Sequence, residues 1–304
     1  MIVHVQNSSP ARGGISRPLL AARAPLTPST MRKLLKVLLI LLLIVAGFYL
    51  YARAEARFDP MVRTATIKLP RWPKGIKPVR AVLISDVHIG SHAMDEARLS
   101  RIVDQIDALN PDIVLMAGDF IYGHDPHGGR KLGPGLVAPF KKLHPPLGVV
   151  AVLGNHDHWT GADDVTSALA QARITVLVND VTARGPIAIG GIDDDFSHHA
   201  NIAATMAKLR PFEGARIILT HSPDIAPRLP GDVHLLLAGH THCGQGVLPF
   251  YGPVASVSRL GDRYRCGLVL DPGRAVIVTG GLGTSGPPLR FGAPPDLWLI
   301  TIEG

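Results

Sequence analysis

The chain has 304 residues, which suffice for one large domain with an added segment or for two modest domains. Hydrophobic residues make up 46% and charged residues 18%, a composition that excludes an intrinsically disordered chain and a coiled coil. Residues 1–54 hold seven of the 31 Lys and Arg residues and no acid, so the other 250 residues carry 24 charges of each sign. This balance predicts no basic surface for nucleic acid.

Residues 1–30 are rich in Ser, Pro, Ala, Gly and Arg and show no hydrophobic period. Such a composition buries too little apolar surface to offset the entropy of ordering, so we expect a disordered extension. Translation from Met31 is the alternative, because Met31-Arg32-Lys33 followed by an apolar run is itself a typical start of an anchor segment.

Residues 31–54 contain the run LLKVLLILLLIVAGFYLY, which is apolar except for Lys36. At about 1.5 Å per residue it reaches roughly 27 Å, close to the ~30 Å hydrocarbon core of a bilayer. We expect a single transmembrane or signal-anchor helix in a bacterial cytoplasmic membrane. A small excess of positive residues before the run favours a cytoplasmic N-terminus and a domain outside the cytoplasm. Cleavage of a secretory signal at Ala52-Arg53-Ala54 is the alternative.

Residues 55–78 contain four prolines, which suits an extended tether. From residue 79 onward, short β-branched runs alternate with stretches of helical period at 94–109 and 199–209. Runs apolar on both faces predict strands of an α/β sheet covered by helices. We therefore expect one domain over 79–304, with strands at 79–84, 113–116, 149–153, 175–178, 187–189, 216–219, 233–237, 275–279 and 297–302.

Polar residues cluster directly after five of these strands. The five blocks are Asp86-Val87-His88, Gly118-Asp119, Gly154-Asn155-His156-Asp157, His221 and Gly239-His240-Thr241-His242. Carboxyl ends of strands form the ligand-binding crevice of an α/β sheet, so the five loops should converge on one site. Each block alone has an ordinary structural explanation, such as a helix cap or a tight turn. Their joint occurrence at strand ends predicts a functional site.

The spacing within these blocks is typical of metal ligands. In Asp-x-His and His-x-His the two donors lie on the same side of an extended segment. Imidazole, carboxylate and amide donors without a thiolate favour Mn, Fe or Zn, and their number suits two divalent ions. Loop histidines such as His124 and His199, and the acidic run Asp193–Asp195, are expected to be solvated.

The order and context of all five blocks resemble the calcineurin-like metallophosphoesterase superfamily. The runs GHTHCGQGVLPF and GTSGPPLRFGAPPDLWLITI are similar, more narrowly, to membrane-associated bacterial phosphodiesterases of the YaeI and YkuE type, which usually have Gly at the position of Cys243. The resemblance implies a four-layer sandwich of two mixed β-sheets flanked by helices, here preceded by one N-terminal transmembrane helix.

The resemblance also implies the ligand sets. One metal would be held by Asp86, His88 and His242, and the other by Asn155, His221 and His240. Asp119 would bridge the two. His156 would act on the phosphate as a general acid or hydrogen-bond donor, with Asp157 orienting its ring.

The implied activity is hydrolysis of a phosphodiester, pyrophosphate or phosphomonoester by in-line attack of a metal-bridging hydroxide. Membrane anchoring suggests a phospholipid-type substrate, and the resemblance to relatives that hydrolyse UDP-diacylglucosamine suggests the same. A phosphorylated small molecule is the other possible substrate. A secreted soluble phosphohydrolase and a catalytically silent binding module are the alternatives. Whether Cys243 and Cys266 pair is left open by sequence separation alone.

Overall fold

A computed structural model describes residues 27–304 of the chain. The expectation for residues 1–30 thus lies outside the described residues except at its last four positions. The chain divides into two compact units, 1–46 and 47–304, which are described separately.

Helix α1, Pro28–Glu55, contains the apolar run. Its most apolar 18-residue window has a mean hydropathy of 2.5 and no buried residue. The helix is therefore long and apolar enough to cross a bilayer, as the sequence predicts. Its last turns, from Gly47 onward, belong to the second unit.

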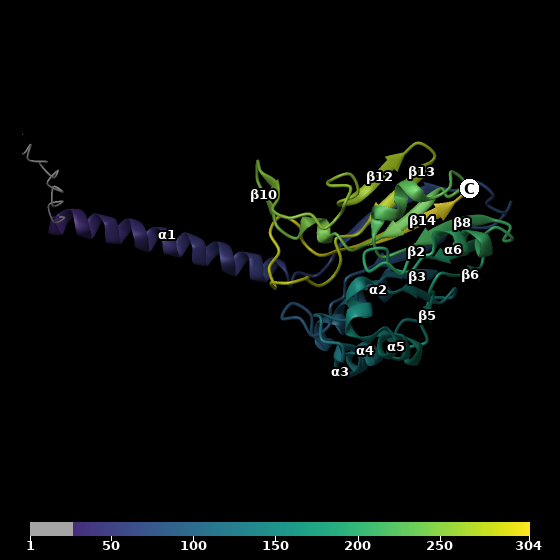
Figure 1. Ribbon diagram of the computed structural model, residues 1–304, viewed down its shortest axis with the longest axis horizontal. Coiled ribbons are helices and arrows are strands. Elements are labelled where there is room, and N and C mark those ends of the chain that lie inside the picture. The colour runs from purple at the N-terminus through teal and green to yellow at the C-terminus, as the bar shows by residue number, and fades with distance from the viewer. Residues whose placement is uncertain (1–26) are drawn as a thin grey trace, which may run out of the picture. The chain divides into compact units, whose positions relative to one another are not determined.

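The second unit contains two six-stranded mixed sheets (Figure 1). The first has the order β1-β14-β2-β3-β4-β5, in which β14 pairs antiparallel with β2 and parallel with β1. Its strands are β1 Met61–Lys68, β2 Val79–Ile84, β3 Ile113–Ala117, β4 Val149–Val152, β5 Thr175–Val176 and β14 Asp296–Glu303.

The second sheet has the order β12-β13-β9-β8-β7-β6, with parallel central strands and an antiparallel strand at each edge. Its strands are β6 Asp180–Arg184, β7 Ile187–Gly191, β8 Ala215–Leu219, β9 Leu235–Ala238, β12 Gly267–Asp271 and β13 Arg274–Val278. A short separate hairpin pairs β10 Val247–Leu248 with β11 Gly252–Pro253.

Side-chain alternation along the strands builds the layers. In β2, Val82 and Ile84 pack with the helices on one face, whereas Ala81 and Leu83 pack against the other sheet. A third apolar cluster lies between the second sheet and α6. The expected four-layer fold is confirmed. The remaining helices are α2 Glu96–Ala108, α3 Gly128–Leu132, α4 Pro134–Phe140, α5 Asn155–Gln171, α6 Ile202–Leu209, η1 Pro223–Arg228 and η2 His242–Gly244.

The expected strands all occur, with shifts of a few residues at their ends. Sequence reasoning missed β1, which lies within the segment expected to be a tether. Residues 61–68 are extended, but they form an edge strand in continuous register with β14, from Met61 opposite Asp296 to Lys68 opposite Glu303. The sheet therefore incorporates eight residues of the segment between the helix and residue 79.

Candidate metal centre

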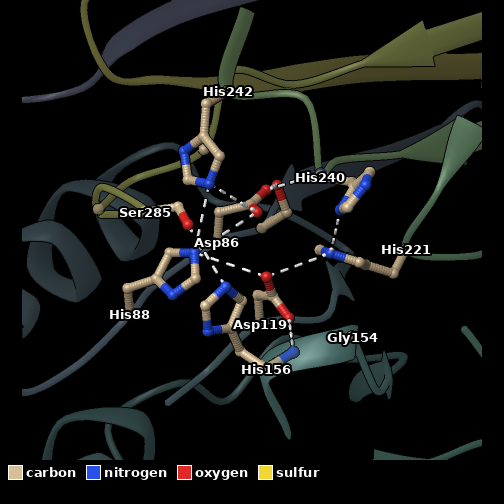
Figure 2. Close-up of polar contacts among 12 residues, drawn as sticks. Asp86, His88, Asp119, Gly154, His156, His221, His240, His242 and Ser285 are labelled. Atoms are coloured by element: carbon tan, nitrogen blue, oxygen red, sulfur yellow. Dashed lines mark hydrogen bonds and ion pairs between the residues drawn. The ribbon is translucent and has the colours of Figure 1, made fainter. Parts of the chain in front are cut away.

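The polar blocks after β2, β3, β4, β8 and β9 converge on one buried site, as predicted (Figure 2). Their loops approach so closely that glycine is required at two points. A Cβ on Gly154 would lie 2.2 Å from Asp119 Oδ1, and one on Gly239 would lie 2.2 Å from Ser85 Oγ. These contacts explain why the Asn155 and His240 blocks each begin with glycine.

One potential ligand group consists of Asp86, His88 and His242, all buried. The Nε2 atoms of the two histidines face each other at 3.3 Å, and His242 Nε2 lies 3.3 Å from Asp86 Oδ1. Two ring nitrogens and a carboxylate oxygen directed at one point are the donor set of a divalent cation.

A second group consists of Asp119, His221 and His240. His221 Nε2 lies 3.1 Å from His240 Nδ1 and 3.3 Å from Asp119 Oδ2. The same oxygen of Asp119 lies 3.5 Å from His88 Nε2, so this carboxylate lies between the two groups (Figure 2). The second ring nitrogen of His221 is fixed at 2.6 Å from the carbonyl of Ala117.

Two buried oxygen atoms at this site lack a hydrogen-bond partner, which supports metal binding there. Asp86 Oδ1 and Asn155 Oδ1 are buried and have no hydrogen-bond partner within residues 27–304. Buried polar atoms without a partner are rare in native proteins because each costs desolvation free energy. A cation beside each atom would satisfy it, and the residues present therefore fit divalent metals.

Electrostatics favour the metal-binding protonation states at most positions. Burial lowers the pKa of His88 and of His240 to about 3. Burial, His88 and Arg290 hold the pKa of His242 well below its usual value, so these rings are neutral with free lone pairs. Burial works to raise the pKa of Asp119, but His221 holds it well below its usual value.

His221 differs from the other rings. Burial works to lower its pKa, yet the charge of Asp119 raises it well above the usual value. In the absence of a cation the pair thus shares a proton. Metal ions generally displace protons from their ligands, so the same lone pair is available to an ion.

Five of the candidate ligands have a left-handed backbone, which is uncommon for residues other than glycine. The φ values are 52° at Asp86, 49° at His88, 58° at Asp119, 71° at His240 and 50° at His242. Such conformations cost free energy and persist where the surrounding structure holds them, commonly at functional sites. Here they turn the side chains at the strand ends into the shared site.

His156 lies beside both groups. Its Nδ1 is 2.8 Å from the carbonyl oxygen of Gly123, and its Nε2 is 3.3 Å from Ser285 Oγ. Because a carbonyl only accepts, Nδ1 carries a hydrogen and Nε2 is the atom directed to the site. A ligand atom of His156 also lies within 4.8 Å of ligand atoms on His88 and Asp119.

The expectation that Asp157 orients the ring of His156 is wrong. Its carboxylate instead accepts backbone hydrogen bonds from Asp119, Phe120 and Gly154 at 2.8–2.9 Å. Asp157 is the third residue of α5, and a carboxylate at that position bonds back to the start of its helix. Asp157 therefore positions the loop of Asp119, and Gly123 and Ser285 orient the histidine.

Arg290 was quoted within the C-terminal motif but received no role from sequence reasoning. Its guanidinium is fully buried and donates to the carbonyls of Gly280, Gly283 and Ala293 at 2.7–2.8 Å. One of its nitrogens lies 3.3 Å from His242 Nδ1. Arg290 thus holds the 280–293 loop against a candidate ligand, which is a contact that no local pattern encodes.

Replacing Arg290 with methionine should lower the free energy of unfolding by about 4 kcal/mol. Each buried carbonyl left without a partner costs roughly 1–3 kcal/mol, and at least three lose their donor. Urea unfolding of the full chain in detergent, followed by tryptophan fluorescence, measures the change. Arg263→Met is the control, because Arg263 pairs with Asp271 at the surface, where its loss should cost far less stability. Equal losses would contradict the role of Arg290.

Cys243 and Cys266 form a disulfide, which resolves the pairing that the sequence left open. It ties the residue after His242 to a segment 23 positions away. The expectation of a solvated acidic run at Asp193–Asp195 is wrong, since all three are buried. Asp193 bonds His158 at 2.8 Å, and Asp195 pairs with Arg228 and Arg259.

Comparison with known proteins agrees with this site. The calcineurin-like phosphoesterase family matches residues 79–244, which include the five polar blocks. An uncharacterized metallophosphoesterase of Aquifex aeolicus is 32% identical over 84% of this chain and 95% of its own length. The uncharacterized metallophosphoesterase YkuE of Bacillus subtilis is 31% identical over 86% of this chain and 92% of its own.

A third relative is named as a membrane protein. It is a transmembrane protein with metallophosphoesterase domain from Danio rerio, 28% identical over 86% of this chain and 62% of its own length. The family match covers more than half of the chain, and the first two relatives are covered over more than nine-tenths of their length, which together assign the family. The chain belongs to the calcineurin-like metallophosphoesterase family and is a hydrolase that acts on phosphoric esters.

Proposed function

We propose that the site holds two divalent ions, Mn, Fe or Zn, and hydrolyses a phosphodiester, pyrophosphate or phosphomonoester of a lipid-linked substrate. The observation that carries the two-ion proposal is the shared oxygen of Asp119, 3.5 Å from His88 Nε2 and 3.3 Å from His221 Nε2. The proposed ligands are Asp86, His88 and His242 for one ion, Asn155, His221 and His240 for the other, and Asp119 for both.

Bound ions would polarise the phosphoryl group and lower the pKa of water, which supplies the nucleophile at neutral pH. The chain's own residues do the rest. The Asp119 and Asp86 carboxylates would offset the mutual repulsion of two bound cations. His156, held at Nδ1 by the Gly123 carbonyl, directs Nε2 to the site. In its doubly protonated form the ring would give the Nε2 proton to the leaving oxygen and keep the hydrogen on Nδ1. Ser285 Oγ at 3.3 Å limits rotation of that ring.

A lipid-linked substrate is supported by the membrane-spanning properties of α1. In this proposal, residues 31–54 anchor the protein in the cytoplasmic membrane by a single pass, and residues 79–304 carry the activity. The disulfide between Cys243 and Cys266 supports a domain outside the cytoplasm, because disulfides persist in oxidising compartments.

The test is a substrate screen with the purified full chain in detergent, supplied with Mn²⁺. Phosphomonoesters, phosphodiesters and lipid pyrophosphates are compared by product release, and bound metal is measured by mass spectrometry after gel filtration. We expect two ions per chain and the highest kcat/KM for a lipid substrate. No release from any substrate by metal-loaded protein would favour a silent binding module. Recovery of the mature chain outside the membrane fraction would favour a secreted hydrolase.

The location of the domain gives a separate prediction. In intact cells, a membrane-impermeant maleimide should label Cys243 and Cys266 only after treatment with a reductant, because the two thiols are joined and the domain faces outward. Cys243→Ser should make Cys266 react without reductant. Labelling of the natural chain only after lysis and without reductant would place the domain in the cytoplasm.

A further inference from the structure

An apolar groove of about 450 Å³ adjoins the metal centre. Val254 and Val257 line it together with Leu289, and all three are aliphatic. His242 and Ser285 line the same groove. Because His242 is a candidate metal ligand and Ser285 contacts His156, a molecule whose phosphate lies at the centre can extend directly into the groove.

The polar groups of the groove are engaged within the protein. The Gln245 amide donates to the Ser285 carbonyl at 3.0 Å and accepts from the Ser285 backbone at 3.0 Å. The Thr241 hydroxyl donates to the Arg265 carbonyl at 2.6 Å. A peptide strand would need partners for its own polar backbone, whereas a hydrocarbon chain needs none. The lining therefore suits an acyl chain.

The groove is also connected to the end of the apolar helix. Phe291 packs against Phe48 and Tyr51 of α1, with ring centroids 4.2 Å apart in a tilted pair and 5.8 Å apart in an edge-to-face pair. The backbone of Phe291 accepts from Val247 at 2.7 Å and donates to Gln245 at 2.9 Å. The β10–β11 hairpin that borders the groove is thus fastened to the last apolar turns of the helix, the place where the helix leaves a bilayer.

The hairpin itself exposes apolar side chains. Phe250 is fully exposed, Tyr251 is 76% exposed and Val254 is 61% exposed. Aromatic residues of this kind are enriched at the membrane interface, where their rings lie among lipid headgroups. The hairpin is connected to the end of α1, and Phe250 and Tyr251 between its strands are exposed. Both observations indicate that lipid contacts this hairpin.

We propose that the groove between 254–257 and 287–289 binds an acyl chain of a membrane lipid while the phosphate of the same molecule lies at the metal centre. This inference rests on the proposed function and names its substrate class: a lipid phosphoester with an acyl chain that enters the groove. The groove then selects lipids over soluble phosphate esters.

The test measures kcat/KM for the hydrolysis of p-nitrophenyl alkyl phosphates whose alkyl chain ranges from ethyl to octyl. The enzyme is the full chain reconstituted in phosphatidylcholine nanodiscs. Each methylene that enters the groove should raise kcat/KM by about two- to fourfold, as expected for burial of one CH₂. Val257→Asp places a charge in the groove. Val178→Asp is the matched control, because Val178 lies outside the groove lining and is 49% exposed against 46% for Val257.

Longer chains also partition into the disc, so the deciding quantity is the difference between variants. We expect the chain-length dependence to be flattened by Val257→Asp and retained by Val178→Asp. Val254→Asp is a second groove variant in case Val257→Asp fails to fold. Equal dependence in all folded variants would overturn the groove assignment and leave the proposed function intact. No hydrolysis of any ester would instead overturn the proposed function.

A readout independent of hydrolysis uses discs doped with a phosphatidic acid that carries a diazirine at the end of one acyl chain. After irradiation, cross-links should map to residues 254–257 and 287–289 and should decrease in Val257→Asp. Cross-links confined to α1 would show that lipid surrounds the anchor without entering the groove, and the inference would then be wrong.

Discussion

Replacing Asp119 with alanine is expected to abolish hydrolysis and to reduce the metal content of the protein from two ions to fewer than one. One oxygen of this carboxylate faces both ligand groups, so its loss removes a ligand and a negative charge from each. We expect kcat/KM to fall by about 10³-fold or more, because loss of one preorganised polar group from such a centre already costs roughly 10²- to 10³-fold. Metal analysis and steady-state kinetics on the same preparation measure both effects.

Asp119→Asn tests the charge separately from the shape. It keeps an oxygen at the same place but cannot neutralise two cations, so metal content should again fall. Asp224→Asn is the control, since Asp224 is also buried but bonds Ser258 and Arg259 and none of the candidate ligands. Two ions retained by the Asp119 variants would mean that this carboxylate does not bridge.

Replacing His156 with alanine should leave both ions in place and lower kcat by about 10²- to 10⁴-fold for substrates with poor leaving groups, as loss of a general acid does. The ring is held at Nδ1 by the Gly123 carbonyl, so the doubly protonated imidazolium would give its Nε2 proton to the departing oxygen and keep the Nδ1 hydrogen. The p-nitrophenolate leaving group needs little protonation, so kcat for a p-nitrophenyl ester should fall less. Parallel kinetics on an alkyl and a p-nitrophenyl ester give the comparison.

The outcomes separate three roles for this histidine. His144→Ala, at an exposed ring that bonds Lys142, should change neither rate nor metal content. Loss of an ion from His156→Ala would make the ring a ligand, which its position near His88 and Asp119 also allows. Equal slowing of both esters would indicate that it stabilises charge on the phosphate and does not protonate the leaving group.

The convergence of the candidate metal ligands was predictable because these residues follow local rules. Asp86, His88 and Asp119 stand directly after apolar strands, and parallel strands bring their carboxyl ends to one edge. The same reasoning placed His240 and His242 correctly. Each of these residues is identified by the strand that precedes it, so no knowledge of distant contacts was needed to bring them together.

The error at Asp157 and the omission of Arg290 have the opposite cause. Adjacency to His156 suggested a shared function, but consecutive residues of a helix point in different directions, and Asp157 turns back to Gly154. Arg290 contacts carbonyls of its own loop and the ring of His242, 48 positions earlier. Such pairs depend on tertiary packing. The edge strand β1 was missed for the same reason, because its partner is more than 200 residues away.

The position of β14 has a consequence for the order in which the protein assembles. β14 lies between the edge strand β1 and β2, so these two strands have no neighbour to join them until residues 296–303 have been synthesised. Until then β2, whose residues 81–84 are fully buried in the native state, has an unpaired edge. The helix that precedes the domain is complete at that stage and is able to enter the membrane. Folding of the domain is thus delayed until residues 296–303 are available, and during that interval the exposed sheet edge is prone to aggregation.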